Sequence, residues 1–150
     1  MTTLTTAQHL VALLGSVKED LLEEMYRRVE AAGYEGLRPS HSCIFRYLDV
    51  DGSKLGELTE LSGMSKQAFG EHVANVEALG YITREPDPDD GRAKLIVPTP
   101  RGREAMLLGR RIFVDLEREW AEAIGEDRVL ALRQTLEEIH ELQSASAALH

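Results

Sequence analysis

The chain is 150 residues long, 43% hydrophobic and 29% charged, so it can bury one good core but has no room for two large domains. It contains no run of about 18 apolar residues, which a membrane span requires, and its first residues lack the basic start and apolar run of a signal peptide. The single cysteine, Cys43, excludes an internal disulfide and a multi-cysteine metal site. We therefore expect a cytoplasmic protein that does not partner with a membrane.

The net charge of -9 argues at first sight against nucleic acid, but the charge is unevenly distributed. Residues 1–63 carry 6 basic and 10 acidic groups, residues 64–111 carry 8 and 7, and residues 112–150 carry 3 and 9. Only the middle third of the chain, residues 64–111, has no net negative charge. An acidic body around a locally basic centre is compatible with a site that meets an anion.

A long amphipathic helix is predicted from Thr6 to Ala32. Its apolar residues recur in steps of three and four, at Leu10, Leu14, Val17, Leu21, Met25 and Val29. At 1.5 Å per residue this helix would be roughly 40 Å long, too long for one small core to cover. We therefore expect part of it to pack on another subunit.

A second, shorter helix is predicted over residues 41–50. Two glycines and a proline in residues 31–40 end the first helix, and Ser40 is a natural cap for the next. Ile44, Tyr47 and Leu48 would lie on the apolar side of that helix.

Residues 55–80 are typical of a helix-turn-helix. Leucines at every third position from Leu55 to Leu61 mark a short helix, and residues 62–65 (SGMS) form a tight turn. Ser65 is a natural N-cap for a further helix to Leu79, which Gly80 would end. Two helices joined by such a turn form a helix-turn-helix.

The second helix of this motif separates apolar from polar residues. Phe69, Val73 and Val76 have the spacing of a core face. The opposite face carries polar and small residues, which would allow close approach to a DNA groove: Lys66, Gln67, Gly70, Glu71 and Ala74, with His72 at the flank. The alternative for Lys66 and Gln67 is an ordinary solvated helix face.

A β-hairpin is predicted after Gly80. Residues 81–85 (YITRE) alternate, residues 87–91 (DPDDG) have turn chemistry, and residues 93–97 (AKLIV) are rich in strand formers. The aspartates are interpreted as loop formers, because their side chains bond to nearby backbone N–H groups. Asp90 would hold the loop while Arg92 points outward; the alternative for Arg92 is a salt bridge to Asp89 or Asp90. A helix-turn-helix followed by a hairpin is a winged helix, with the hairpin loop as the wing.

Two C-terminal helices complete the predicted fold. Thr99 and Pro100 form a cap and first-turn pair that opens the first of them. Apolar residues then recur in steps of three and four on both sides of Gly125, at Ile112, Leu116 and Trp120 and at Val129, Leu132, Leu136, Ile139 and Leu142. Such a seam indicates helix-on-helix association between chains.

The segment from Leu58 to Gly102 (LTELSGMSKQAFGEHVANVEALGYITREPDPDDGRAKLIVPTPRG) resembles the MarR family of transcriptional regulators. The positions that match the family pattern are Glu77, Gly80, Ile82, Arg84, Asp90, Arg92, Thr99 and Gly102. The resemblance implies a homodimer built from the two ends of the chain, with winged helices on duplex DNA and often a small-molecule pocket. We expect a mainly α (α+β) fold with three regions: a dimerisation helix over residues 1–37, a winged helix-turn-helix DNA-binding domain over 38–102, and dimerisation helices over 103–150.

The DNA contacts are predicted from charge and reach. Ser65, Lys66 and the first amides of the recognition helix would meet phosphates, and Gln67 would read a base edge in the major groove. Arg92 would enter the minor groove, with Arg84 and Lys94 against the DNA backbone. The remaining predicted contacts lie on the recognition helix and the wing: Gly70, Glu71, His72 and Asp90.

A small aromatic or drug-like effector would occupy a cleft near four side chains, Tyr26, Tyr34, His41 and Phe45. The resemblance implies that such compounds release DNA. The alternative is that these side chains are packed solid. Cys43 lies beside Ile44 on a buried helix, which favours a core thiol over a peroxide sensor.

No enzyme, metal or cofactor signature is present in the sequence. There is no nucleophile elbow, no glycine-rich phosphate loop and no carboxylate pair that periodicity would bring together in a pocket. The five histidines, including His140 and His150, have no metal-ligand spacing. The alternative function is a winged-helix adaptor that binds protein rather than DNA. The net charge of -9 and Glu71 favour that alternative, whereas Lys66, Arg92 and Lys94 oppose it.

Overall fold

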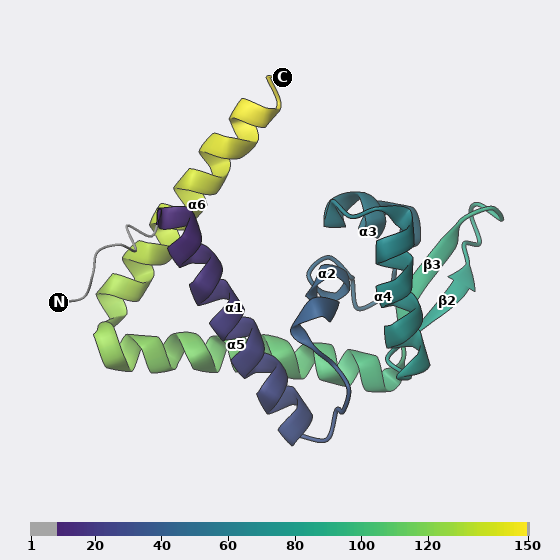
Figure 1. Cartoon of the computed structure of the whole chain (residues 1–150), viewed down its shortest axis with the longest axis horizontal. Helices are drawn as coiled ribbons and strands as arrows, with labels where there is room; N and C mark the ends of the chain where they lie inside the picture. The colour runs from purple at the N-terminus through teal and green to yellow at the C-terminus, as the bar shows by residue number, and fades with distance from the viewer. Residues whose placement is uncertain (1–8, 150) are drawn as a thin grey trace. The chain divides into compact units, whose positions relative to one another are not determined.

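The computed structural model describes residues 9–149 and is mainly helical, with a small three-stranded sheet (Figure 1). Its elements in chain order are α1 (Leu10–Ala31), the 3-10 helix η1 (Pro39–His41), α2 (Ser42–Phe45), β1 (Ser53–Lys54), α3 (Leu55–Ser62), α4 (Lys66–Ala78), β2 (Ile82–Pro86), β3 (Lys94–Pro98), α5 (Pro100–Ile124) and α6 (Glu126–Ala147). The predicted fold class is confirmed. The described residues form two compact units, which meet between Arg111 and Ile112 within α5.

Helix α1 is buried only toward its C-terminal end. Met25, Tyr26 and Val29 are buried there, as the predicted apolar stripe requires. The N-terminal half instead exposes its large apolar side chains, which are Leu10, Val11, Leu13, Leu14 and Val17. The predicted start at Thr6 lies outside the described residues, as does His150.

The predicted helix over residues 41–50 is shorter than expected, and Ser40 is not its cap. Arg38 is extended, as a residue before proline tends to be, and Pro39 opens η1. The N–H of Arg38 donates to Nδ1 of His41 at 3.0 Å, so the side chain of His41 closes this turn instead. Helix α2 ends at Phe45, before a turn at Asp49, whose carboxylate accepts from the N–H of Asp51 at 2.9 Å.

The helix-turn-helix is formed as predicted. Helix α3 ends at Gly63, whose φ of 69° is left-handed, and Ser65 caps α4 by accepting from the N–H of Ala68 at 3.1 Å. Phe69, Val73 and Val76 are completely buried. Burial of each such side chain stabilises the fold by about 1.5–3 kcal/mol relative to exposure.

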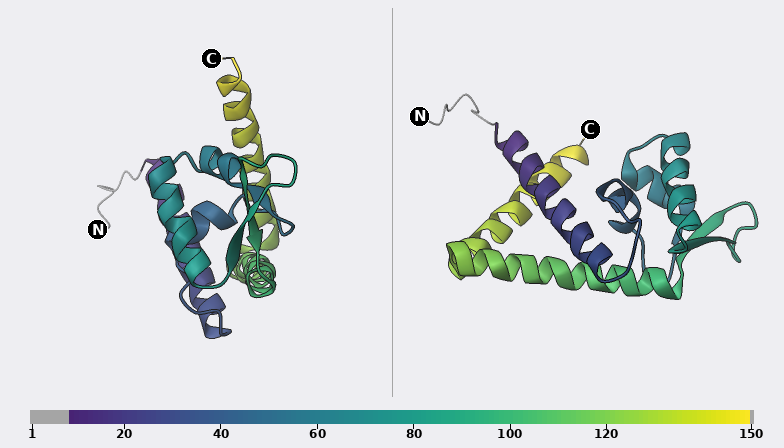
Figure 2. Two further views of the ribbon diagram at one scale, coloured as in Figure 1. Left: turned by 90° about the vertical axis from the view of Figure 1, so that its right-hand side faces the viewer. Right: turned by 60° about the horizontal axis from the view of Figure 1, so that its bottom comes forward.

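The predicted hairpin belongs to a sheet with the strand order β1-β3-β2. Strands β2 and β3 are antiparallel, in register from Ile82 opposite Pro98 to Pro86 opposite Lys94. Figures 1 and 2 show the hairpin loop extending beyond α4. Strand β1 was not predicted, because its two residues are too few to show an alternating pattern.

Thr99 opens α5, as predicted, and also joins it to the start of the hairpin. Its Oγ1 accepts from the N–H of Gly102 at 3.0 Å and donates to the carbonyl of Gly80 at 2.7 Å. A Cβ on Gly102 would lie 1.8 Å from the carbonyl oxygen of Tyr81, so only glycine fits at this contact. The wing is therefore held at both of its ends.

The second unit consists of the C-terminal part of α5 and all of α6. Ile112 and Leu116 of α5 are buried, and Arg133 of α6 forms an ion pair with Glu117 of α5. No residue of α6 between Glu126 and Ala147 is buried. Its exposed apolar residues include Leu132, Leu136, Ile139 and Leu142.

Across residues 9–149, every helix is too short or too polar to cross a bilayer. The division into two units reflects packing alone. The prediction of three regions with separate roles in dimerisation and DNA binding, bounded at residues 37 and 102, therefore stays a prediction.

Candidate nucleic-acid interface

Helix α4 presents its polar face to solvent because its apolar face is fully used. Phe69, Val73 and Val76 fix the rotation of the helix by their complete burial. On the opposite side Ser65, Lys66, Gln67 and Glu71 are exposed, and Gly70 and His72 are half-buried. The first turn carries no acidic residue, so the positive end of the helix dipole is not neutralised there.

The wing loop is built by aspartate side chains bonding to the backbone, as predicted. Oδ1 of Asp87 accepts from the N–H of Asp89 at 2.9 Å, and Oδ1 of Asp90 accepts from the N–H of Arg92 at 3.1 Å. The N–H of Asp87 donates to the carbonyl of Ala93 at 3.1 Å and closes the loop. These bonds define the position from which the Arg92 side chain leaves the wing.

The side chain of Arg92 is exposed, and it has no ion pair with any residue in the range 9–149. The alternative prediction, a salt bridge to Asp89 or Asp90, is therefore not formed. Lys94, at the start of β3, is also exposed. The wing thus offers two cations to an external anion.

Arg84 has a partner within the chain. Its Nε lies 3.5 Å from Oε1 of Glu77, and its backbone N–H donates to Oε2 of the same carboxylate at 3.1 Å. Glu77 belongs to α4 and Arg84 to β2, so this pair joins α4 to the wing. The predicted contact of Arg84 with the DNA backbone stays a prediction, and the pairing gives Arg84 a structural role that sequence reasoning missed.

Asp87 at the base of the wing is buried, which the sequence did not indicate. It is 4% exposed, and its Oδ2 accepts no hydrogen bond within the described part of the chain. Nζ of Lys54 on β1 lies 3.9 Å from that oxygen. The unpredicted strand β1 therefore brings a cation to the buried carboxylate that shapes the wing.

The four predicted effector-site residues have different surroundings in the structure. Tyr26 is buried and its hydroxyl accepts from Ser42 at 3.2 Å, whereas the hydroxyl of Tyr34 donates to Glu104 at 3.1 Å. Burial is the main cause that raises the pKa of Tyr26. His41 is buried and hydrogen-bonded, and Phe45 is half-buried.

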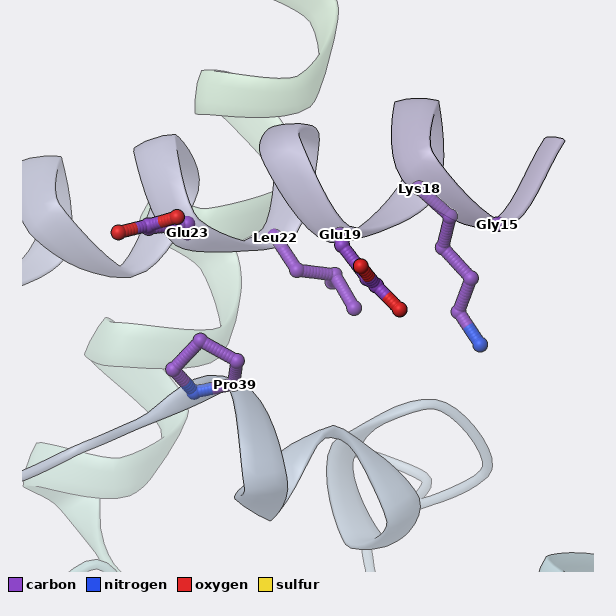
Figure 3. Close-up of a pocket in the computed structure, with 6 residues that line it drawn as sticks. All are labelled: Gly15, Lys18, Glu19, Leu22, Glu23 and Pro39. Atoms are coloured by element: carbon purple, nitrogen blue, oxygen red, sulfur yellow. The ribbon is translucent and has the colours of Figure 1, made fainter. Parts of the chain in front are cut away.

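A hollow does occur beside α1, but other residues line it (Figure 3). They are Gly15, Lys18, Glu19, Leu22, Glu23 and Pro39. In Figure 3 the α1 side chains of Leu22, Glu19 and Lys18 extend on the side of Pro39. The predicted effector site stays a prediction.

Cys43 is half-buried, and its Sγ donates to the carbonyl of Ser40 at 3.3 Å. Burial raises the pKa of the Cys43 thiol, so the reactive thiolate is scarce near neutral pH. This environment favours the core-thiol interpretation. Residues 9–149 hold no group of three or more His, Cys, Asp and Glu side chains suited to a metal ion.

Comparison with known proteins shows similarity to one family. A sequence model described as MarR family matches residues 35–93, the part of the chain that runs from the end of the α1–η1 connection to the wing loop. No curated protein sequence matches the chain significantly.

Several solved structures have a similar fold along most of their length. Streptococcus pneumoniae FabT in complex with DNA is 14% identical, with a TM-score of 0.74 over 92% of this chain and 97% of that one. A mutant MarR from E. coli complexed with operator DNA is 17% identical, with a TM-score of 0.67 over 91% and 94%. A MarR transcriptional regulator from Methanosarcina mazei is 14% identical, with a TM-score of 0.71 over 91% and 94%.

Because these identities are low, the solved structures show only that the fold is similar. The similarity to the family in sequence comes from the match over residues 35–93. The matched residues 35–93 include both helices of the helix-turn-helix and Arg92 of the wing. Residues 35–93 of the chain are therefore similar in sequence to the MarR family, and the chain shares the fold of the winged-helix MarR structures compared above.

Proposed function

We propose that the chain binds duplex DNA through α4 and the wing, as a homodimer on a pseudo-palindromic operator, and that it acts as an effector-responsive repressor. One observation carries the proposal: the apolar face of α4 is completely buried while its polar face and Arg92 of the wing remain open to solvent. Two of the similar solved structures are complexes with DNA, which supports the same conclusion.

Helix α4 enters the major groove in this proposal. Ser65 and Lys66 at its N-terminus contact phosphates, and Gln67 is long enough to form paired hydrogen bonds with an adenine edge. Gly70 and the flanking His72 allow the helix backbone to approach the groove closely. Glu71 accepts from a cytosine amino group, since elsewhere its charge would be repelled by phosphates.

The wing follows the DNA backbone into the adjacent minor groove. Arg92 inserts there, where the negative potential is greatest, and Asp90 keeps the loop in the shape that directs it. Lys94 contacts the phosphates beside the groove, and Arg84 keeps the hairpin in place through Glu77 while adding its charge. Each neutralised phosphate contributes about -0.9 to the slope of log affinity against log salt concentration.

The homodimer is supported by the apolar surface that the chain exposes on its terminal helices. The N-terminal half of α1 and the seam along α6 carry leucine, isoleucine and valine side chains that solvate poorly. Two copies related by a two-fold axis would present their α4 helices about one DNA turn apart, roughly 34 Å, and so would read a pseudo-palindrome.

The effector of this proposal is a small aromatic or drug-like molecule near Tyr26, Tyr34, His41 and Phe45. Three of these side chains have hydrogen-bond partners in the chain, so the site must repack to admit a ligand. Benzoate and larger aromatic acids are suitable probes. A release of bound DNA by millimolar probe, without loss of the folded state in circular dichroism, would support this part of the proposal.

The first experiment selects duplex fragments of the source genome on the purified protein and measures their affinity by fluorescence anisotropy. We predict that Arg92→Ala weakens binding by about 1–3 kcal/mol, roughly fivefold to 150-fold, because one groove contact is lost. Arg27→Ala, which removes the same charge from an exposed site on α1, is the matched control.

Equal affinities of wild type and Arg92→Ala would show that the wing does not contact DNA. A wild-type protein that binds no duplex at low salt would favour the alternative, a winged-helix adaptor that binds protein. The net charge of -9 keeps that alternative worth testing.

A further inference from the structure

A buried histidine joins the recognition helix to the segment before α2. His41, the last residue of η1, is 3% exposed. Its Nδ1 accepts from the backbone N–H of Arg38 at 3.0 Å, and its Nε2 lies 2.8 Å from Oδ1 of Asn75 on α4. The imidazole therefore bridges two elements that are 34 residues apart in the sequence.

The two hydrogen bonds require one form of the ring. The Arg38 amide can only donate, so Nδ1 must present a lone pair, and the single proton of a neutral imidazole then lies on Nε2. That proton is donated to the carbonyl oxygen of the Asn75 side chain. A protonated ring would direct a second N–H at the Arg38 amide, and two donors would face each other in a buried site.

The neighbouring groups also oppose a positive charge on His41. The ring of His72, one helical turn before Asn75 on α4, meets it edge-on with centroids 6.2 Å apart. The positive charge of Arg38 also lowers the pKa of His41. Burial is the main cause that lowers the pKa of His41; the hydrogen bond with Asn75 acts in the opposite direction.

The other elements packed on η1 bring few charges that change near neutral pH. Helix α2 brings the thiol of Cys43, and α1 brings Tyr26, whose pKa values are both raised by burial. Lys18, Glu19 and Glu23 of α1 line the hollow beside Pro39, the first residue of η1.

We propose that His41 is a positioning residue for DNA recognition, whose neutral ring holds α4 against η1 through Asn75 and whose protonation releases this link and weakens specific binding. The inference rests on the proposed function, because it concerns the orientation of the helix that reads DNA. Asn75 lies eight positions after Gln67 on the same helix, so the link acts on the C-terminal half of the element whose N-terminal half meets the groove.

The sign of the pH effect follows from the lowered pKa. The unfolded chain takes up a proton on His41 near pH 6.5, whereas the folded chain does so only at a lower pH. The stabilising contribution of the neutral ring is therefore complete above about pH 6.5 and is lost as the pH falls from there toward the folded-state pKa.

Two substitutions of His41 separate its two hydrogen bonds. His41→Gln places an amide near the position of Nε2, can still bond Asn75, and does not titrate. His41→Asn places an acceptor near the position of Nδ1 for the Arg38 amide but does not reach Asn75. His9→Gln, at an exposed histidine before α1, is the matched control.

The test measures the affinity of full-length protein for a selected duplex from about pH 5.5 to about pH 8 at constant ionic strength. We expect the ratio of wild-type to His41→Gln affinity to stay constant above about pH 6.5. It should fall only toward the acidic end of this range, where the folded chain takes up the proton, by roughly twofold to tenfold, the equivalent of one net hydrogen bond. His41→Asn should be weaker than wild type by a similar factor near neutral pH, and this difference should shrink at acidic pH as the wild type loses the link. His9→Gln should follow wild type at every pH.

A double-mutant cycle guards against a general loss of folding. Asn75 is exposed, so Asn75→Ala should fold, and it should lose about as much affinity at pH 7.5 as His41→Asn, with no further loss in the double variant. Additive losses, or superimposable pH profiles of wild type and His41→Gln, would overturn the inference while leaving the proposed function intact. If the wild type binds no duplex at any pH, the proposed function itself is wrong and the inference falls with it.

Discussion

Helices α4 and α6 each carry a stripe of large apolar side chains, but the two stripes differ in exposure. Phe69, Val73 and Val76 of α4 are completely buried. None of the residues of α6 is buried, and its leucines and isoleucine face solvent. Helix α4 is thus complete within one chain, and its open surface is polar. Helix α6 is incomplete, and its open surface is apolar.

This difference in exposed surface suits the two helices to different proposed functions, DNA reading for α4 and association between chains for α6. A polar face whose position is fixed by a buried core is suited to reading a polar ligand such as a DNA groove, because the side chains are held before binding. An exposed apolar seam is instead suited to a second helix surface. We therefore propose that α4 and the wing recognise DNA and that α1 and α6 assemble the dimer.

The largest expected effect comes from breaking the core behind α4. Phe69→Ala removes a completely buried ring and should lower the free energy of unfolding by about 3–5 kcal/mol. Urea unfolding followed by circular dichroism measures this loss as a lower midpoint. Leu61→Ala on α3, at a side chain that is 56% exposed, is the control and should change stability by less than about 0.5 kcal/mol.

The apolar seam of α6 should respond through assembly. Leu136→Glu places a charge in the proposed interface and removes a side chain whose burial is worth about 1.5–3 kcal/mol, so it should weaken the dimer at least tenfold. Sedimentation velocity over a dilution series measures the change. Gln134→Glu adds the same charge elsewhere on α6 and is the control. If both variants weakened the dimer equally, the apolar seam would not be the dimer interface.

The smallest effect is expected at the pair that joins α4 to the wing. Glu77→Ala removes the acceptor of the Arg84 amide and the partner of its guanidinium. Because the pair is partly exposed, this substitution should lower the free energy of unfolding by only about 0.5–1.5 kcal/mol. Glu60→Ala, on the exposed side of α3, is the control for loss of one carboxylate. A variant as stable as wild type would show that the tie contributes nothing measurable.

The features predicted correctly from sequence are those set by neighbouring residues. The spacing of Phe69, Val73 and Val76, the cap at Ser65, the turn at Gly80 and the aspartate-rich wing all depend on local rules. Strand β1 was not predicted, because two residues are too few to show an alternating pattern. The 3-10 helix η1, which begins at Pro39, was also not predicted, because the side chain of His41 rather than Ser40 closes that turn.

The contacts that support the candidate site could not be predicted in the same way. Glu77 with Arg84, Lys54 with Asp87 and His41 with Asn75 each join two different elements. Sequence periodicity places a residue on a face of its own helix or strand, but it carries no information about which residue of another element lies opposite. The exposed residues Lys66, Gln67 and Arg92 were recognised because exposure follows from that local face.

The most direct test of the account is the salt dependence of wild-type binding to a selected duplex. If α4 and the wing of two chains meet phosphates through Lys66, Lys94 and Arg92, log affinity should fall linearly with log salt concentration, by about 0.9 for each phosphate neutralised. Arg92→Ala should make that slope shallower. An affinity that does not change with salt, or no binding in dilute buffer, would contradict the claim that this face binds DNA.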